Sequence, residues 1–187
     1  MKLKKIMSLI VIVICVITLI VYLIVVNSDK EVPEYTPQAE ITDDELRNTI
    51  VTLYFENKDT GELQTEARLV DSKKLLNDPY QYLVNLLIEG PKNDSLRKII
   101  PEGAILKNTT LLGECLTLNF SKEFLSNATG DAFSKSNILY SIINTVTELK
   151  EVSRVKFLIE DVESDGFNDV GISFKNEFTR LNNTAGQ

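Results

Sequence analysis

Ser95-Leu96-Arg97-Lys98 is the first of several groups of side chains whose types and spacing could do chemistry. Ser-x-x-Lys is the acylating pair of penicillin-recognising enzymes, in which the serine is the nucleophile. The chain has no Lys-Thr-Gly partner motif, and its globular part of about 130 residues is too short for that architecture. We therefore interpret Ser95 and Lys98 as part of a solvated helical turn.

Acidic residues at Asp161, Glu163 and Asp165, followed by Gly166, resemble the first half of a calcium-binding loop. Such a loop places oxygen ligands at positions 1, 3 and 5, glycine at 6 and a bidentate glutamate at 12. Position 12 is Ile172 here. The pattern therefore favours an acidic turn over a calcium site.

Other catalytic groups are scarce. Histidine is absent, which removes the commonest general base and the commonest zinc ligand. Cys115 alternates with Leu116 and Leu118 and has no basic neighbours in sequence, so we expect an unreactive thiol. Sequence spacing alone does not show two carboxylates facing each other as in a glycosidase. We predict no catalytic residue, cofactor or metal site, and a cell-wall hydrolase is the least favoured alternative.

The amino-terminal segment has the pattern of a membrane anchor. Lys2, Lys4 and Lys5 precede Ile6 to Val26, a run of 21 residues without charge, which as a helix spans about 30 Å. The end of the run lacks a small-residue cleavage site, and the residues before Cys15 do not form a lipobox. The sequence predicts a retained anchor over residues 1–27, with the lysines in the cytoplasm and the rest outside the cell membrane.

Beyond the anchor the chain is acidic. Without the three amino-terminal lysines it has 17 basic and 27 acidic residues, a net charge of −10. This charge argues against nucleic acid as a partner. Residues 28–48 contain two prolines and seven acids before Arg47, as expected of a solvated stalk, and residues 49–187 form the predicted domain.

Alternating and helical patterns in the domain predict its elements. Strands are expected over 50–55 and over 63–69, where Leu63, Thr65, Ala67 and Leu69 alternate on one face, and a turn containing Gly61 joins them. Further strands are expected over 105–112 and 115–120. Asp78-Pro79 is typical of a helix start, and the helix that follows ends at Gly90-Pro91. Its aromatic residues Tyr80 and Tyr82 are interpreted as core and rim rather than as a stacking platform.

The second half of the domain adds a helix over 131–149, a strand over 155–159 and a short edge strand over 171–174. Ser121 suits an N-cap. The order β-β-α-β-β-α-β predicts an α+β domain with two layers, in which two helices cover one face of a mostly antiparallel mixed sheet. The side chains expected to face the helices are Val51, Leu53, Phe55, Leu116, Leu118, Phe120, Phe157 and Ile159.

Four motifs in order resemble a known family. They are Leu86-Leu87-x-x-Gly90-Pro91, Ile100-Pro101-x-Gly103, Leu116-x-Leu118-x-Phe120-Ser121-x-Glu123-Phe124, and Ile143-x-Thr145-Val146-Thr147-Glu148 before Val155-x-Phe157. Together they look like the GerM-type sporulation and spore germination (GerMN) domain, over about Val51 to Arg180. In this comparison the structural motif residues are Gly90, Pro91, Pro101, Gly103 and Ser121.

The resemblance implies a non-catalytic module of the Gram-positive cell envelope, similar to ring-building motifs of secretion systems. We therefore expect a membrane-anchored interaction module whose partners are envelope or sporulation-complex proteins, and its own copies in a homo-oligomer or ring. A sensor that binds cell-wall fragments or calcium is the alternative function.

Overall fold

The computed structural model describes residues 2–26 and 47–180. The chain divides into two compact units, residues 1–40 and residues 41–187. In the first unit, α1 is a single helix over Lys2–Val26. Among the helices of the described residues, none is both long enough and apolar enough to cross a membrane. The predicted stalk lies almost entirely outside the described residues.

The second unit begins with a hairpin of β1 (Asn48–Asn57) and β2 (Leu63–Asp71). Nine residue pairs from Asn48↔Asp71 to Glu56↔Leu63 join the strands without a bulge, and Gly61 supplies the positive φ (74°) that the turn requires. A two-residue strand, β3 (Leu96–Arg97), pairs with the other side of β1 at its end. The first sheet therefore has the order β2-β1-β3 and is fully antiparallel.

The second sheet has the order β4-β5-β6-β7, and β8 also pairs with β6. Its strands are β4 (Leu106–Leu112), β5 (Cys115–Phe120), β6 (Arg154–Ile159), β7 (Val162–Glu163) and β8 (Phe178–Thr179). β5 and β6 are parallel, whereas the other pairs are antiparallel. The parallel pair requires the crossover that the helix between these strands provides.

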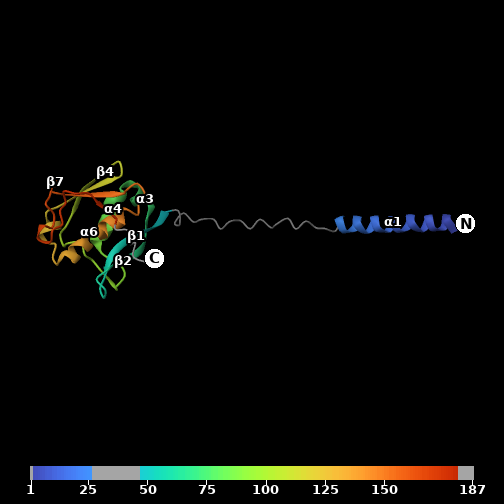
Figure 1. Ribbon diagram of the computed structural model, residues 1–187, viewed down its shortest axis with the longest axis horizontal. Coiled ribbons are helices and arrows are strands. Elements are labelled where there is room, and N and C mark those ends of the chain that lie inside the picture. Colours follow the sequence, from blue (N-terminus) through green and yellow to red (C-terminus); the bar gives the residue numbers. More distant parts are fainter. Residues whose placement is uncertain (1, 27–46, 181–187) are drawn as a thin grey trace. The chain divides into compact units, whose positions relative to one another are not determined.

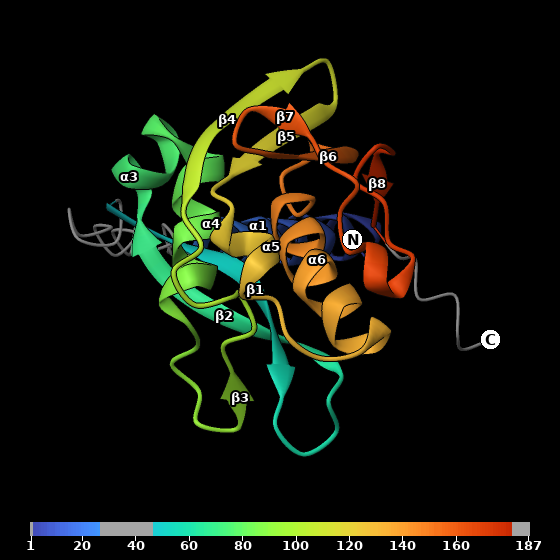
Figure 2. The same cartoon turned by 90° about the vertical axis from the view of Figure 1, so that its left-hand side faces the viewer.

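Two long helices lie between the sheets (Figures 1 and 2). α4 (Pro79–Glu89) begins at the predicted cap, where the Asp78 carboxylate accepts the Gln81 N–H at 3.2 Å. α6 (Ala132–Val146) begins at Asp131, whose carboxylate accepts the Ser134 N–H at 2.9 Å. Two short helices, α3 (Ser72–Asn77) and α5 (Glu123–Ser126), follow β2 and β5.

The prediction of one mixed sheet is wrong, because α6 occupies the place where a further strand would pair with β1. The Ser141 hydroxyl donates to the Tyr54 carbonyl at 2.5 Å, and the Tyr54 N–H donates to the Thr145 hydroxyl at 3.1 Å. Helix side chains thus satisfy backbone groups at the edge of β1. The eight predicted core side chains are nevertheless all buried, and they approach α4 and α6 from two sheets instead of one.

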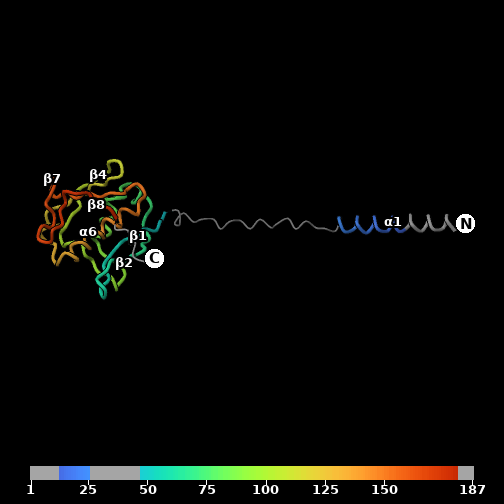
Figure 3. Tube along the Cα trace, viewed as in Figure 1, coloured from blue at the N-terminus to red at the C-terminus, as the bar shows by residue number. Residues whose placement is uncertain are grey.

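The segment from β7 to β8 packs through aromatic side chains. Figure 3 shows it at the orange and red end of the colour bar. Phe174 is fully buried, with ring centroids 5.3 Å from Phe157 and 5.2 Å from Phe167. The predicted strand over 171–174 is wrong: Ile172 forms an isolated bridge with Phe167, after a 3₁₀ helix, η1, over Asn168–Val170. Aromatic packing, rather than strand pairing, fixes this segment.

Candidate functional site

Two charged residues on β2 are buried and hold the chain that follows α4. Glu66 and Arg68 keep only 9% and 5% exposure and form an ion pair. Arg68 Nη2 donates to the Gly90 carbonyl at 2.9 Å. Glu66 Oε2 accepts the backbone N–H groups of Lys92 and Asn93 at 2.8 Å and 2.9 Å. We call Glu66 and Arg68 the β2 clamp, because they attach the segment 90–93 to this strand.

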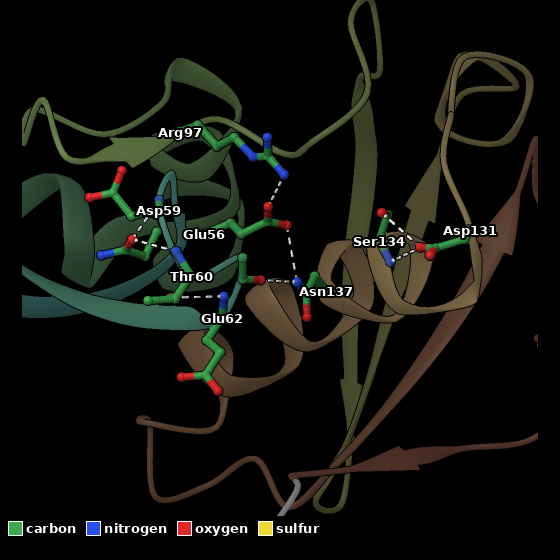
Figure 4. A network of polar contacts seen from close by, with 10 residues as sticks. Glu56, Asp59, Thr60, Glu62, Arg97, Asp131, Ser134 and Asn137 are labelled. Carbon is green, nitrogen blue, oxygen red and sulfur yellow. Dashed lines mark hydrogen bonds and ion pairs between the residues drawn. The ribbon is translucent and has the colours of Figure 1, made fainter.

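A second buried acid lies at the end of β1 (Figure 4). Glu56 is 2% exposed. Its carboxylate forms an ion pair with Arg97 of β3 and accepts Asn137 Nδ2 of α6 at 3.0 Å. Asn137 Nδ2 also donates to the Gly61 carbonyl at 2.8 Å. The network therefore joins β1, the hairpin turn, β3 and α6, and its ion pair and hydrogen bonds hold these elements together.

Alternation in the sequence did not indicate Glu66 and Arg68, because it pointed to the other face of β2. The alternation of Leu63, Thr65, Ala67 and Leu69 suggested an apolar face, but Leu69 is 63% exposed. The other face, with Glu66 and Arg68, shares a side of the sheet with Val51 and Leu53. The register of the hairpin could have indicated that Glu66 is buried. A loop closed by Asn57 and Glu62 places Glu66 opposite Leu53, on the face that the core residues of β1 occupy.

The clamp predicts an acid-dependent loss of stability. Burial alone would raise the pKa of Glu66, but the Asn93 N–H, Arg68 and the Lys92 N–H outweigh it and hold the pKa below the ordinary value. A depressed folded pKa contributes stability above the ordinary glutamate pKa of about 4.3, and this stability is lost as pH falls through the folded pKa. We expect the gap in unfolding free energy between wild type and Glu66→Gln to narrow from pH 6 to pH 3.

Urea denaturation of the domain at several pH values measures this gap. Glu62→Gln changes an exposed acid just before β2 and supplies the reference slope. A gap for Glu66→Gln that follows the Glu62→Gln reference over the whole pH range would contradict the assignment.

The structure does not bring the Ser-x-x-Lys residues together as a catalytic pair. The Ser95 hydroxyl donates to Asn93 Oδ1 at 2.8 Å, and Lys98 Nζ donates to the exposed Glu102 at 3.3 Å. Ser95 lies in a hydrogen-bonded turn, closed by Leu96 N–H to the Asn93 carbonyl at 3.0 Å, and the chain continues from it into β3, so the predicted helical turn is wrong. The segment forms an edge of the first sheet instead.

The three acids of the calcium-like loop lie with three different lysines. Asp161 lies 3.6 Å from Lys107, Glu163 pairs with Lys156, and Asp165 lies 2.5 Å from Lys175. Asp161 also occupies the turn between β6 and β7 with a positive φ (68°), where its N–H donates to Asn119 Oδ1 at 2.9 Å. Within residues 2–26 and 47–180, His, Cys, Asp and Glu side chains nowhere gather in threes that could hold a metal ion.

Cys115, Tyr80 and Tyr82, the remaining candidate residues, lie in or against the packed parts of the domain. Cys115 is half-buried at the start of β5, where burial and then the Glu177 carboxylate raise the pKa of its thiol, so the thiolate is disfavoured. Tyr80 and Tyr82 pack against the hydrophobic core. The Tyr80 hydroxyl lies 3.4 Å from Glu151 Oε1.

The family to which the chain belongs follows from its sequence. A family model described as "Germane: Sporulation and spore germination" matches residues 52–165. The chain belongs to this family. A search of curated proteins finds no match.

Two solved structures of GerMN domains show the same fold. The tandem GerMN domains of the sporulation protein GerM from Bacillus subtilis share 19% identity with a TM-score of 0.59, covering 76% of this chain and 49% of that chain. The first GerMN domain of the same protein shares 16% identity with this chain at a TM-score of 0.58, and the match covers 72% of this chain and 99% of that domain. A putative lipoprotein from Clostridium perfringens shares 24% identity at a TM-score of 0.47, and the match covers 74% of this chain and 92% of that chain. This chain thus spans about half the length of the tandem GerM structure.

Gly90 and Pro91, the first motif residues of the resemblance to GerMN domains, end α4. Gly90 has φ 102°, and its N–H donates to the Leu86 carbonyl at 3.2 Å. An added Cβ there would lie 3.4 Å from Lys98 Cβ. Because the Gly90 carbonyl also accepts Arg68, this motif both stops the helix and meets the β2 clamp.

The later motif residues of the GerMN domain build the turn before β4. The Pro101 carbonyl accepts the Ala104 N–H at 3.1 Å, and Gly103 has φ 77°. Ser121 is not the predicted N-cap: α5 is preceded by Lys122 without a side-chain cap, and the Ser121 hydroxyl accepts the Ile105 N–H at 3.1 Å. Ser121 therefore ties the end of β5 to the start of β4.

Proposed function

We propose that this Germane-family protein is a membrane-anchored, non-catalytic module that works outside the cell membrane by contacting other proteins of an envelope or sporulation complex. The observation that carries the proposal is the outer strand β2, nine residues long, whose solvent-facing residues from Leu63 to Leu69 carry no charge. The candidate catalytic groups support it, because Ser95, Lys98 and the buried acids Glu56 and Glu66 are engaged in contacts within the fold.

The anchor is part of the proposal and rests on the sequence. Residues 6–26 carry no charge, and the lysines lie before them. In cell fractionation we expect the full chain to stay with membranes after alkaline carbonate washing. Ile14→Asp together with Leu19→Asp is expected to release it, since an acid at the centre of a spanning helix costs about 2.5–3.5 kcal/mol.

The control for this experiment is Thr109→Asp together with Thr117→Asp, which adds the same charge within the domain. It should leave the protein in the membrane fraction. A wild-type chain that is washed into the soluble fraction, or a double aspartate variant that stays in the pellet, contradicts the anchor.

The interaction role is tested by crosslinking in intact cells, vegetative and sporulating, with the full chain as bait. We expect envelope proteins to be recovered with the wild type, and protease added to protoplasts to remove a carboxyl-terminal epitope. Recovery of no envelope protein under either condition would remove the support for an interaction module.

A further inference from the structure

The outer edge of β2 offers backbone groups for pairing. The Tyr54 N–H and carbonyl bond to α6, away from β2, so Tyr54↔Thr65 is a non-hydrogen-bonded pair of the ladder. The N–H and carbonyl groups of Thr65, Ala67 and Leu69 then point away from β1, at the free edge of the sheet. Within residues 47–180 these groups have no hydrogen-bond partner.

This edge lacks the features with which sheets usually prevent pairing. β2 contains neither lysine nor proline, and its register with β1 has no bulge. Glu66 and Arg68 are buried on the inner face and used in the β2 clamp, and the exposed Asp71 stands at the end of the strand, where its carboxylate caps α3. Next to the edge, Leu69 and its cross-strand neighbour Ile50 are 63% and 68% exposed.

A groove follows the same edge. It has a volume of about 470 Å³ and is lined by residues 65–69 of β2 on one side and by Lys92 and Asn93 on the other. Because Glu66 fixes the Lys92 and Asn93 N–H groups, the far wall is held in place before any partner arrives. An extended chain fits such a site as an added strand.

The charges around β2 identify the occupant. Lys58, Asp59 and Glu62 lie before the strand and carry a net charge of −1 (one base, two acids), whereas Asp71, Lys73 and Lys74 lie at its end and carry +1 (two bases, one acid), and all six side chains are exposed. An antiparallel copy of the same strand places the acidic end of one chain beside the basic end of the other, whereas a parallel copy places like charges together.

We propose that β2 pairs antiparallel with β2 of a second copy of this chain, about a two-fold axis at Ala67. Ala67 then faces its counterpart in a hydrogen-bonded pair, and Thr65 faces Leu69 of the second copy. The two three-stranded sheets become one six-stranded sheet, and the isologous contact closes as a dimer. This inference rests on the proposed function and names one of its partners.

Sedimentation equilibrium of the domain over residues 41–187 tests the pairing. This unit contains the whole described core, from Val51 to Phe178, and so is expected to fold alone. We expect a reversible dimer with a dissociation constant in the micromolar range, since pairing of one strand buries less than a standard interface of about 1,600 Å². Ala67→Lys should raise the dissociation constant at least tenfold.

Thr110→Lys is the matched control, because Thr110 is an exposed residue of β4, the outer strand of the other sheet. It should change the dissociation constant less than twofold. A domain that remains monomeric at 0.5 mM, or a dimer equally stable in Ala67→Lys and Thr110→Lys, overturns the proposal.

A disulfide provides a second measurement that does not depend on affinity. In a Cys115→Ser background, Ala67→Cys should form an intermolecular disulfide on mild oxidation, since Cα atoms of a hydrogen-bonded antiparallel pair lie about 5.5 Å apart, within disulfide range. Thr110→Cys in the same background should crosslink at least tenfold more slowly. Equal rates would overturn the two-fold register.

Failure of this pairing is distinguishable from failure of the proposed function. If the domain is monomeric but the full chain still crosslinks to envelope proteins in cells, self-pairing is wrong and the interaction module stands. If the dimer forms but cells yield no envelope partner, self-pairing stands and the proposed interaction with envelope proteins is wrong.

Discussion

Gly166→Ala is expected to lower the unfolding free energy of the domain by about 2–5 kcal/mol. Gly166 has φ 75°, a conformation that costs an alanine about 1–2 kcal/mol. An added Cβ would also lie 2.5 Å from the Ile172 carbonyl oxygen and 2.6 Å from Phe174 Cδ1. Overpacking against a backbone atom and a fully buried ring adds about 1–3 kcal/mol.

Gly171→Ala is the matched control for this prediction. Gly171 has the same φ of 75°, but a Cβ there meets nothing within 4 Å. Its loss should therefore be confined to the backbone cost of about 1–2 kcal/mol. Urea denaturation followed by circular dichroism measures both variants, and equal losses would show that the segment from β7 to β8 does not pack tightly on Phe174.

Parts of this fold follow from local sequence signals. Asp78-Pro79 and Gly90 bound α4 as predicted, because capping and the left-handed conformation depend on neighbouring residues alone. The strand over 115–120 was predicted with its bounds. Alternation also identified Val51 and Phe157 as core, because each lies on a strand with one apolar face.

Other parts depend on contacts between distant segments. Ser141 and Thr145 are a polar stripe on a helix, and only the approach of β1 makes them its hydrogen-bond partners. That approach separates the two sheets. The same limit applies to β2, where alternation pointed to the face of Leu69, yet Leu69 is exposed and Arg68 is buried, because Arg68 meets its partners Glu66 and Gly90 only in the folded chain.

Arg68→Met is expected to destabilise the domain by about 3–5 kcal/mol, because it leaves the Glu66 carboxylate buried without its ion pair. Arg154→Met breaks an ion pair with Glu177 whose side chains are 46% and 40% exposed, and should cost about 0–1 kcal/mol. The double variant Glu66→Gln, Arg68→Met should cost less than Arg68→Met alone, since it retains no unpaired charge.

Hydrogen exchange connects this loss with the groove beside β2. The Lys92 and Asn93 amides donate to Glu66 Oε2, so their exchange reports whether the clamp still holds the far wall. Both amides should exchange faster in Arg68→Met than in Arg154→Met, because Arg68 orients the carboxylate that accepts them. Unchanged exchange in a destabilised Arg68→Met would show that Glu66 holds segment 90–93 alone, and that Arg68 serves stability without shaping the edge proposed to receive a second copy.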